Sequence, residues 1–335
     1  MVDKATNYLT ENTGYRSEIG YANIRWFNSV SIDELTIYDQ NDVKMIDVNE
    51  VVISFKLKEL IGGKDISINE AWLNKASVNL RNEGNNGLNI DNWVAKITDL
   101  TSVPGPAPTD PSVFSIDKVT LVNSEFSLSD ARKDSISDGF DYNHFTLKNL
   151  RADIRNLESI GSNFEINVQF LTAEDQASGL KIDNLETIFQ TSLKKMAFTN
   201  LDLKIGKSHI KDSIVFNFDD PSAMSEFVTE VDFDANFKSS LLHSDELSYF
   251  VPEFKKYDQQ IRIDGYFQGK VNSFYSDDFE ISFGEYSKLN GRLDIEGLPN
   301  INETIFDVDL DDSFLKATDL RQFINDRTFK ISNKL

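Results

Sequence analysis

The sequence of 335 residues contains no cysteine, which excludes disulfide bonds, thiolate metal sites and cysteine nucleophiles. Histidine occurs three times and proline seven times. No stretch approaches the roughly 18 consecutive apolar residues that a membrane-spanning helix requires. The sequence therefore predicts no thiol chemistry and no transmembrane helix within these residues.

Basic residues are also scarce, because 34 Lys and Arg oppose 55 Asp and Glu and leave a formal net charge of -21. The basic side chains are scattered, and the net field repels phosphate backbones, so nucleic acid is not expected as a partner. Apolar residues make up 40% of the chain and include 25 Phe, which is enough to form a core and excludes global disorder.

One short segment has helical periodicity, and most of the rest alternates with the period of a strand. Residues 2–12 predict an amphipathic helix that stops at Gly14. Four of the seven prolines lie in residues 104–112, which predict a loop between a first β unit (14–103) and further β structure (113–335). The alternating segments are residues 32–37, 51–57, 66–68, 76–80, 164–170, 201–205, 214–218, 231–237, 261–263, 279–283, 293–295 and 306–310.

Two internal echoes indicate repetition. Residues 68–80 align without gaps on residues 116–128, each with a break near the middle, at Asn74 or Val122. Residues 241–251 align likewise on residues 314–324, where a strand enters a short helix with Ser244 or Thr318 as its N-cap. Together the echoes predict repeated β units.

Strands that are apolar on one side need that side covered. One interpretation is an ordinary sandwich or barrel whose sheets cover each other. The other is a curled antiparallel sheet whose apolar trough holds acyl chains, which the Phe-rich face and the few helices favour. The residues predicted to line this face are Ile53, Phe55, Ile66, Ile68, Val78, Leu80, Phe126, Phe164, Ile166, Val168, Phe170, Leu203, Ile214, Phe216, Phe218, Phe233, Phe237, Ile263, Phe279, Ile281, Phe283, Phe306 and Val308.

No residue pattern predicts catalysis, a cofactor or a metal. The three histidines have no partnering acid at metal-ligand spacing and are expected at the surface or at strand edges. Asp307, Asp309, Asp311 and Asp312 resemble a calcium loop only superficially, because the central Gly and distal Glu are missing, and they predict the wet face of a strand.

Two further features have structural and functional interpretations. Gly265 and Gly269 predict bulges or close strand approaches rather than a phosphate loop. Trp26, Trp72 and Trp93 could stack sugars, which leaves a secreted glycan-binding β-sandwich as an alternative.

Several segments resemble AsmA-like proteins, in particular the TamB-type translocation and assembly proteins of the Bacteroidota. In the first part these are GYANIRWF (20–27), IDELTIY (32–38), VVISFKLKEL (51–60), GKDISINEA (63–71) and GLNIDNW (87–93). In the later part they are SDELSYFVPEF (244–254), GYFQGKV (265–271) and LNGRLDIEGLP (289–299).

The resemblance implies a β-taco, an elongated twisted sheet with a hydrophobic groove, in a non-enzymatic periplasmic protein that bridges the inner and outer membranes. It implies phospholipid as cargo and an Omp85-type outer-membrane barrel as partner. A transmembrane helix before residue 2 and a characteristic C-terminal domain are expected in the full-length protein. A scaffold for outer-membrane assembly with a simply packed interior is the alternative.

Overall fold

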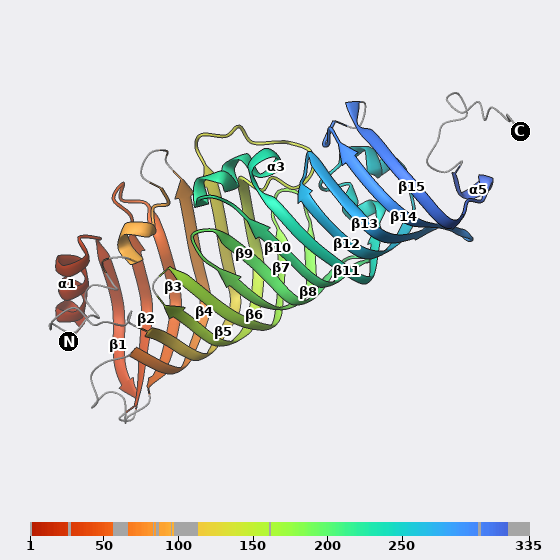
Figure 1. Ribbon diagram of the computed structural model, residues 1–335. Coiled ribbons are helices and arrows are strands. Elements are labelled where there is room, and N and C mark those ends of the chain that lie inside the picture. The colour runs from red at the N-terminus through yellow and green to blue at the C-terminus, as the bar shows by residue number, and fades with distance from the viewer. Residues whose placement is uncertain are drawn as a thin grey trace, which may run out of the picture. The chain divides into compact units, whose positions relative to one another are not determined.

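The computed structural model describes residues 2–25, 28–55, 66–82, 84, 87–94, 96, 113–160, 162–300 and 303–320. The chain divides into two compact units, residues 1–193 and 194–335, described separately below. Within each unit the strands follow one another in the sheet in the order of the chain (Figure 1). The predicted all-β class is confirmed, and the described residues contain no second sheet that covers the first.

Unit 1 begins with the only helix that the sequence pattern located in the first half. This helix, α1 (Val2–Thr13), ends where Gly14 takes a φ of +74° and its N–H donates to the carbonyl of Thr10 at 2.9 Å. The strands that follow are β1 (Ser17–Arg25), β2 (Ser29–Tyr38), β3 (Lys44–Phe55), β4 (Ile66–Asn82), β5 (Val113–Asp130), β6 (His144–Ile160), β7 (Asn163–Asp175) and β8 (Lys181–Thr191).

Unit 2 contains the remaining strands, all paired antiparallel with their neighbours within the unit. They are β9 (Lys195–Ile205), β10 (Ser208–Asn217), β11 (Asp232–His243), β12 (Gln260–Lys270), β13 (Ser273–Phe283), β14 (Ser287–Glu296) and β15 (Ile305–Phe314). Short helices join them: η1 (Pro221–Glu226), α3 (Phe227–Glu230), α4 (Ser244–Leu247), η2 (Pro252–Lys256) and α5 (Ala317–Leu320).

The first sequence echo is a pair of neighbouring strands. β4 and β5 pair in parallel, and the partners run from Ile68 with Ile116 to Leu80 with Leu128, which is the register of the sequence alignment. A parallel pair needs a crossover connection, so the predicted antiparallel sheet contains a parallel step here. The Pro-rich segment predicted as a loop, 104–112, falls in this connection and lies outside the described residues.

Long strands in both units bend at residues with positive φ. These are Glu34, Lys75, Asn123, Asn149 and Asn156 in unit 1, and Asn200, Asp212 and Ser239 in unit 2. Leu73 and Ala76, on either side of Lys75, belong to the same apolar cluster, so the bend moves the apolar pattern from odd to even positions. The strand register shifts at all of these positions except Glu34 and Lys75, and bulges of this kind bend and twist strands.

Serine hydroxyl groups satisfy the backbone at two of these bends. The Oγ of Ser124 accepts from the N–H of Ala76 at 3.3 Å. The Oγ of Ser240 accepts from the N–H of Lys211 at 2.9 Å and donates to the carbonyl of the same residue at 3.3 Å. Both serines are buried, so these bonds replace ladder bonds that the bulge interrupts.

The second echo corresponds to a repeated pair of serine hydrogen bonds, a latch, that joins a short helix to a hairpin. Ser208 Oγ donates to Glu246 at 2.9 Å and accepts from the N–H of His243 at 2.8 Å. In the second copy Ser287 Oγ donates to Asp319 at 2.9 Å and accepts from the N–H of Lys316 at 3.0 Å. The echo alignment places Glu246 on Asp319 and His243 on Lys316, so it marks a true structural repeat.

The predicted N-caps are wrong. α4 begins at Ser244 and its N-cap is His243, whose Nδ1 accepts from the N–H of Asp245. α5 begins at Ala317, so Thr318 lies inside that helix. Ser244 instead uses its hydroxyl to donate to the carbonyl of Tyr257 at 2.8 Å.

A buried carboxylate organises the turn between β2 and β3. Asp39 accepts from the N–H groups of Asn41 and Val43 at 2.9 and 3.1 Å, from Asn89 at 3.2 Å, and from the guanidinium of Arg81. Burial raises the pKa of Asp39, but the bond from Arg81 and the other hydrogen bonds outweigh it, so the net pKa lies below the ordinary value.

We expect Asp39→Ala to lower the free energy of unfolding by about 2–3 kcal/mol, because it leaves buried donors and Arg81 without their acceptor. The Asp39 side chain is only 2% exposed, whereas that of Arg81 keeps 22%, which holds the cost below that of a fully buried pair. Urea denaturation monitored by tryptophan fluorescence measures it, since all three tryptophans lie in unit 1.

The pH dependence of the same site has a defined sign. A lowered folded-state pKa means that ionised Asp39 stabilises the fold above the unfolded-state value of about 4, and that this stabilisation is lost as the pH falls through the folded-state pKa. The stability difference between the wild type and Asp39→Asn should therefore be constant near neutral pH and shrink below about pH 4. A difference that grew on acidification would contradict this assignment.

Candidate functional site

The apolar face of unit 2 is built from rows of Phe and Gly across β11 to β14. Phe233 pairs with Gly269, and Gly269 pairs with Phe274, so the two rings meet across the glycine with centroids 5.5 Å apart. A Cβ at Gly269 would lie 2.8 Å from the Cα of Phe274. Gly265 makes an equally close approach to Phe279, so the close strand approaches predicted for both glycines are confirmed.

The core of this face is a single apolar cluster with buried residues from β12, β13 and β14. Phe267, Phe279, Leu293 and Ile295 are buried, and the half-buried Phe233, Phe237, Ile263, Phe274, Ile281, Leu289 and Leu298 pack against them. The side chains around the buried centre thus keep part of their apolar surface exposed. A contiguous group of large apolar side chains that keep part of their surface exposed is typical of a binding surface.

Short helices cover one end of this face. Phe227 of α3 packs on Phe216 of β10 with ring centroids 5.2 Å apart, and Phe218, Ala223 and Val231 are buried beside them. The part of the face next to β9 and β10 is therefore closed by protein.

Most of the predicted face residues are buried or half-buried, and nine of them lie in or beside apolar clusters. Ile53 and Phe126 pack against clusters of unit 1, and Phe216, Phe218, Phe233, Phe237, Ile263, Phe279 and Ile281 belong to those of unit 2. Ile68 and Val168 are buried, and Phe55, Val78, Leu80, Phe164, Ile166, Leu203, Ile214 and Phe283 are half-buried. Phe306 and Val308 are exposed, and the side chain of Ile66 lies outside the described part of the chain.

The face predicted for Phe170 is wrong. The register between β6 and β7 shifts after Ile154, which pairs with Val168, so that Asp153 pairs with Phe170. Ile154 packs in the apolar cluster, and Asp153 precedes it on the opposite side of the strand. Phe170 therefore shares the polar face with Asp153, and it is 40% exposed.

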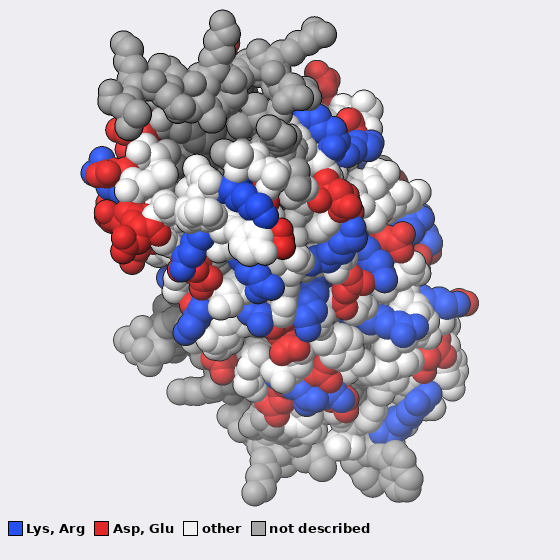
Figure 2. All heavy atoms as spheres, turned by 90° about the vertical axis from the view of Figure 1, so that its right-hand side faces the viewer, with Lys and Arg blue, Asp and Glu red and all other residues white. Residues whose placement is uncertain are grey.

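The polar face carries charges of both signs. Lys118 pairs with Glu70 at 2.7 Å, and Lys288 pairs with Glu280 at 2.6 Å, each across neighbouring strands. Figure 2 shows Lys and Arg interspersed with Asp and Glu over the surface turned to the viewer. The scattered basic residues of the sequence thus lie among acids in the folded chain.

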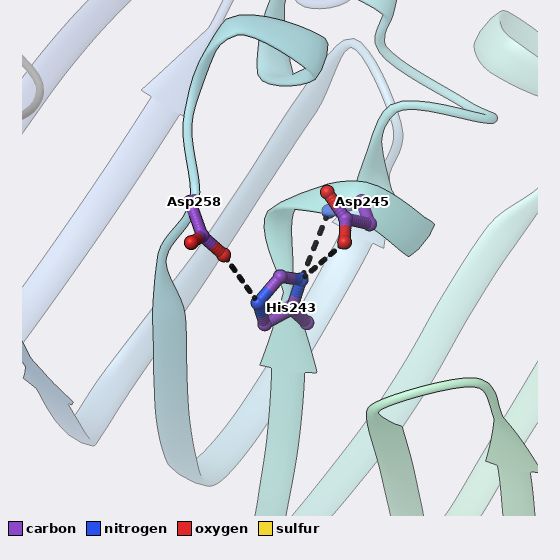
Figure 3. Close-up of side chains that lie close together, drawn as sticks. All are labelled: His243, Asp245 and Asp258. Atoms are coloured by element: carbon purple, nitrogen blue, oxygen red, sulfur yellow. Dashed lines mark hydrogen bonds and ion pairs between the residues drawn. The ribbon is translucent and has the colours of Figure 1, made fainter.

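The sequence predicts no acid at metal-ligand spacing from the histidines, but each histidine has an acidic partner in the folded chain. His144 Nδ1 lies 3.1 Å from Asp141, and His209 Nε2 lies 2.9 Å from Asp202. His243 is buried at the end of β11, with Asp258 at 3.1 Å from its Nε2 and Asp245 at 3.4 Å from its Nδ1 (Figure 3).

The cluster of His243, Asp245 and Asp258 has the residue types of a metal site, with ligand atoms within 4.8 Å of one another. Its hydrogen bonds assign it another role. Nδ1 of His243 accepts from the N–H of Asp245 at 3.2 Å, while its Nε2 lies 3.1 Å from Asp258 and 3.4 Å from Lys207 Nζ. A metal on Nε2 would place the ring proton on Nδ1, which could then no longer accept from Asp245 at the helix cap.

A basic side chain already balances these acids. Lys207 Nζ lies 2.9 Å from Asp245. This bond lowers the pKa of Asp245 and raises the pKa of Lys207. The cluster thus joins the β9–β10 turn to α4. The spacing of residues in the sequence did not predict this cluster, because Asp258 comes from a separate segment, fifteen positions after His243.

The tryptophans do not form one described surface. Trp72 lies in β4, half-buried, and pairs with Val52 and Thr120. Trp93 packs instead against the cluster of Tyr15, Ile37 and Met45. Trp26 lies outside the described residues, so a sugar-stacking platform has no support from the other two.

No helix in the described part of the chain is both long and apolar enough to cross a membrane. A scan against protein-family models gave no match, and a search of curated proteins gave none either.

Proposed function

We propose that this chain is a non-enzymatic, lipid-handling segment whose apolar sheet face shields the acyl chains of phospholipids. The partly exposed apolar face of β11 to β14 is the observation that carries the proposal. Phe, Ile and Leu side chains of this face would contact acyl chains, while charged side chains of the other face remain in water.

The resemblance to AsmA-like proteins extends this proposal to the cell envelope. By that analogy the chain acts in the periplasm, as part of a bridge that carries phospholipid between the inner and outer membranes. It would also support outer-membrane assembly with an Omp85-type barrel. This second part depends on the resemblance alone, and the lipid-binding test below does not require it.

The proposal predicts which face meets lipid. A photoreactive amino acid in place of Phe283 should crosslink to labelled phospholipid, because Phe283 pairs with Ile261 and shares the face of Ile281. The same amino acid in place of Ser282 is the matched control, since Ser282 pairs with Arg262 and Lys288 on the polar face. The yield of lipid adduct from each position, measured by mass spectrometry, checks the prediction.

Equal crosslinking from the two positions would contradict the assignment of the face. Lipid extraction from the purified chain gives an independent test. If no phospholipid co-purifies and none can be loaded from vesicles, the interior is simply a packed core and the scaffold function is favoured.

A further inference from the structure

Strand β15 has only one neighbour in the described part of the sheet. It pairs with β14 from Lys288 with Phe314 to Glu296 with Ile305. It is the last strand of the sheet order (Figure 1). Among the described residues its outer edge therefore has no partner strand, and backbone N–H and C=O groups at such an edge are a template for another strand.

The apolar side chains of β15 extend the apolar rows of unit 2, but they are more exposed than the buried side chains of those rows. Val308 pairs with the buried Leu293, and Phe306 pairs with the buried Ile295. Phe306 is 57% exposed, and Val308 and Leu310 are 40% and 41% exposed. The rows thus end at β15 with apolar surface that a further strand would bury.

The other side of β15 is acidic, with Asp307, Asp309 and Asp311 at alternate exposed positions. Asp307 pairs with Asp294, so the nearest strand adds a further negative charge there. Arg292, opposite Asp309, is the one basic residue of β14 among the partners of these three acids. This edge therefore favours a strand with basic side chains on its polar face.

The same acids disfavour a second copy of this chain. Suppose that two copies paired through their β15 edges with the apolar side chains of both strands on the same face. The odd-numbered residues of one strand, which include Asp307, Asp309 and Asp311, would then lie next to the odd-numbered residues of the other. Asp would then lie opposite or diagonal to Asp in either strand direction, which is destabilising. Charged residues on edge strands commonly prevent self-association in this way.

We propose that the outer edge of β15 accepts an added β-strand from another polypeptide, in which large apolar residues alternate with Lys or Arg. Main-chain hydrogen bonds would provide the pairing, and the alternation would bury Phe306, Val308 and Leu310 while the basic residues face Asp307, Asp309 and Asp311. This site is distinct from acyl-chain binding and does not depend on it.

The test uses the full chain and a labelled synthetic peptide in which Val alternates with Lys. We expect saturable binding by fluorescence anisotropy, with an affinity that falls as salt rises. A peptide with Glu in place of Lys should bind at least about tenfold more weakly, because it places like charges opposite each other. A peptide methylated on alternate backbone nitrogens should also lose binding, since it keeps the side chains but not the donors.

Neutral variants locate the site. Asp307→Asn, Asp309→Asn and Asp311→Asn together should abolish the preference for Lys over Glu peptides. Glu158→Gln, Glu174→Gln and Glu186→Gln in unit 1 remove the same charge from exposed positions elsewhere and should leave the preference unchanged. The proposal is overturned if the methylated peptide or a block peptide of Val then Lys binds equally well, if no peptide binds, or if the chain self-associates through β15.

Discussion

Phe279→Ala should lower the free energy of unfolding of unit 2 by about 3–5 kcal/mol, the range for a large aromatic side chain removed from a core. Phe279 is 2% exposed and packs with Phe267, Leu293 and Ile295. Its neighbours across the two adjoining strands are Gly265 and Gly291. Because neither glycine has a side chain, little can move into the space left by the ring, so the cost should be near the upper end.

The matched control is Phe306→Ala, which removes the same side chain from an exposed position in the same unit. We expect a loss below about 1 kcal/mol, because more than half of the Phe306 surface stays in water. Urea denaturation followed by circular dichroism measures both variants, and hydrogen exchange of β12 to β14 localises the effect. Similar losses for the two variants would mean that the apolar cluster is not the core of unit 2.

Local signals were sufficient where a single element determines the structure. The helical spacing of residues 2–12 and Gly14 after it predicted α1 to within one residue, because the glycine alone allows the left-handed stop. Alternation located the strands but divided β4 into two, since Lys75 at its bend takes a φ of +53° that a Lys rarely adopts.

Self-similarity contained more information than its first interpretation used. An ungapped echo between residues 68–80 and 116–128 is what two adjacent parallel strands with equivalent neighbours produce, and β4 and β5 have that register. The echo of residues 241–251 in residues 314–324 preserved the acid of a latch, although Glu246 and Asp319 differ in length.

Features that depend on tertiary pairing could not be predicted. A register shift between β6 and β7 determines which face of the sheet carries Phe170, and no residue in β7 indicates that shift. Asp258 reaches His243 only because η2 returns the chain to the end of β11. The apolar face itself was predictable, because burial of alternating side chains determines it. The helices that cover one end of it were not.

Gly291→Ala should detach β15 from the sheet. Gly291 has a φ of +147°, and a Cβ there would overlap the carbonyl oxygen of Asp309 on β15. The backbone strain costs about 1–3 kcal/mol, and the overlap adds about 1–3 kcal/mol because it meets backbone rather than a flexible side chain. Hydrogen exchange should therefore increase in β14 and β15, and the variant should unfold at lower urea concentrations.

Gly14→Ala separates the two contributions. Gly14 also has a positive φ, +74°, but a Cβ there would meet nothing within 4 Å, so only the strain term applies. The Gly291 variant should also lose binding of the Val–Lys peptide, because the edge that binds it is displaced, whereas Gly14→Ala should retain it. If Gly291→Ala kept both the exchange protection of β15 and the peptide affinity, β15 would not be held by its close approach to Gly291, and the edge site would need another basis.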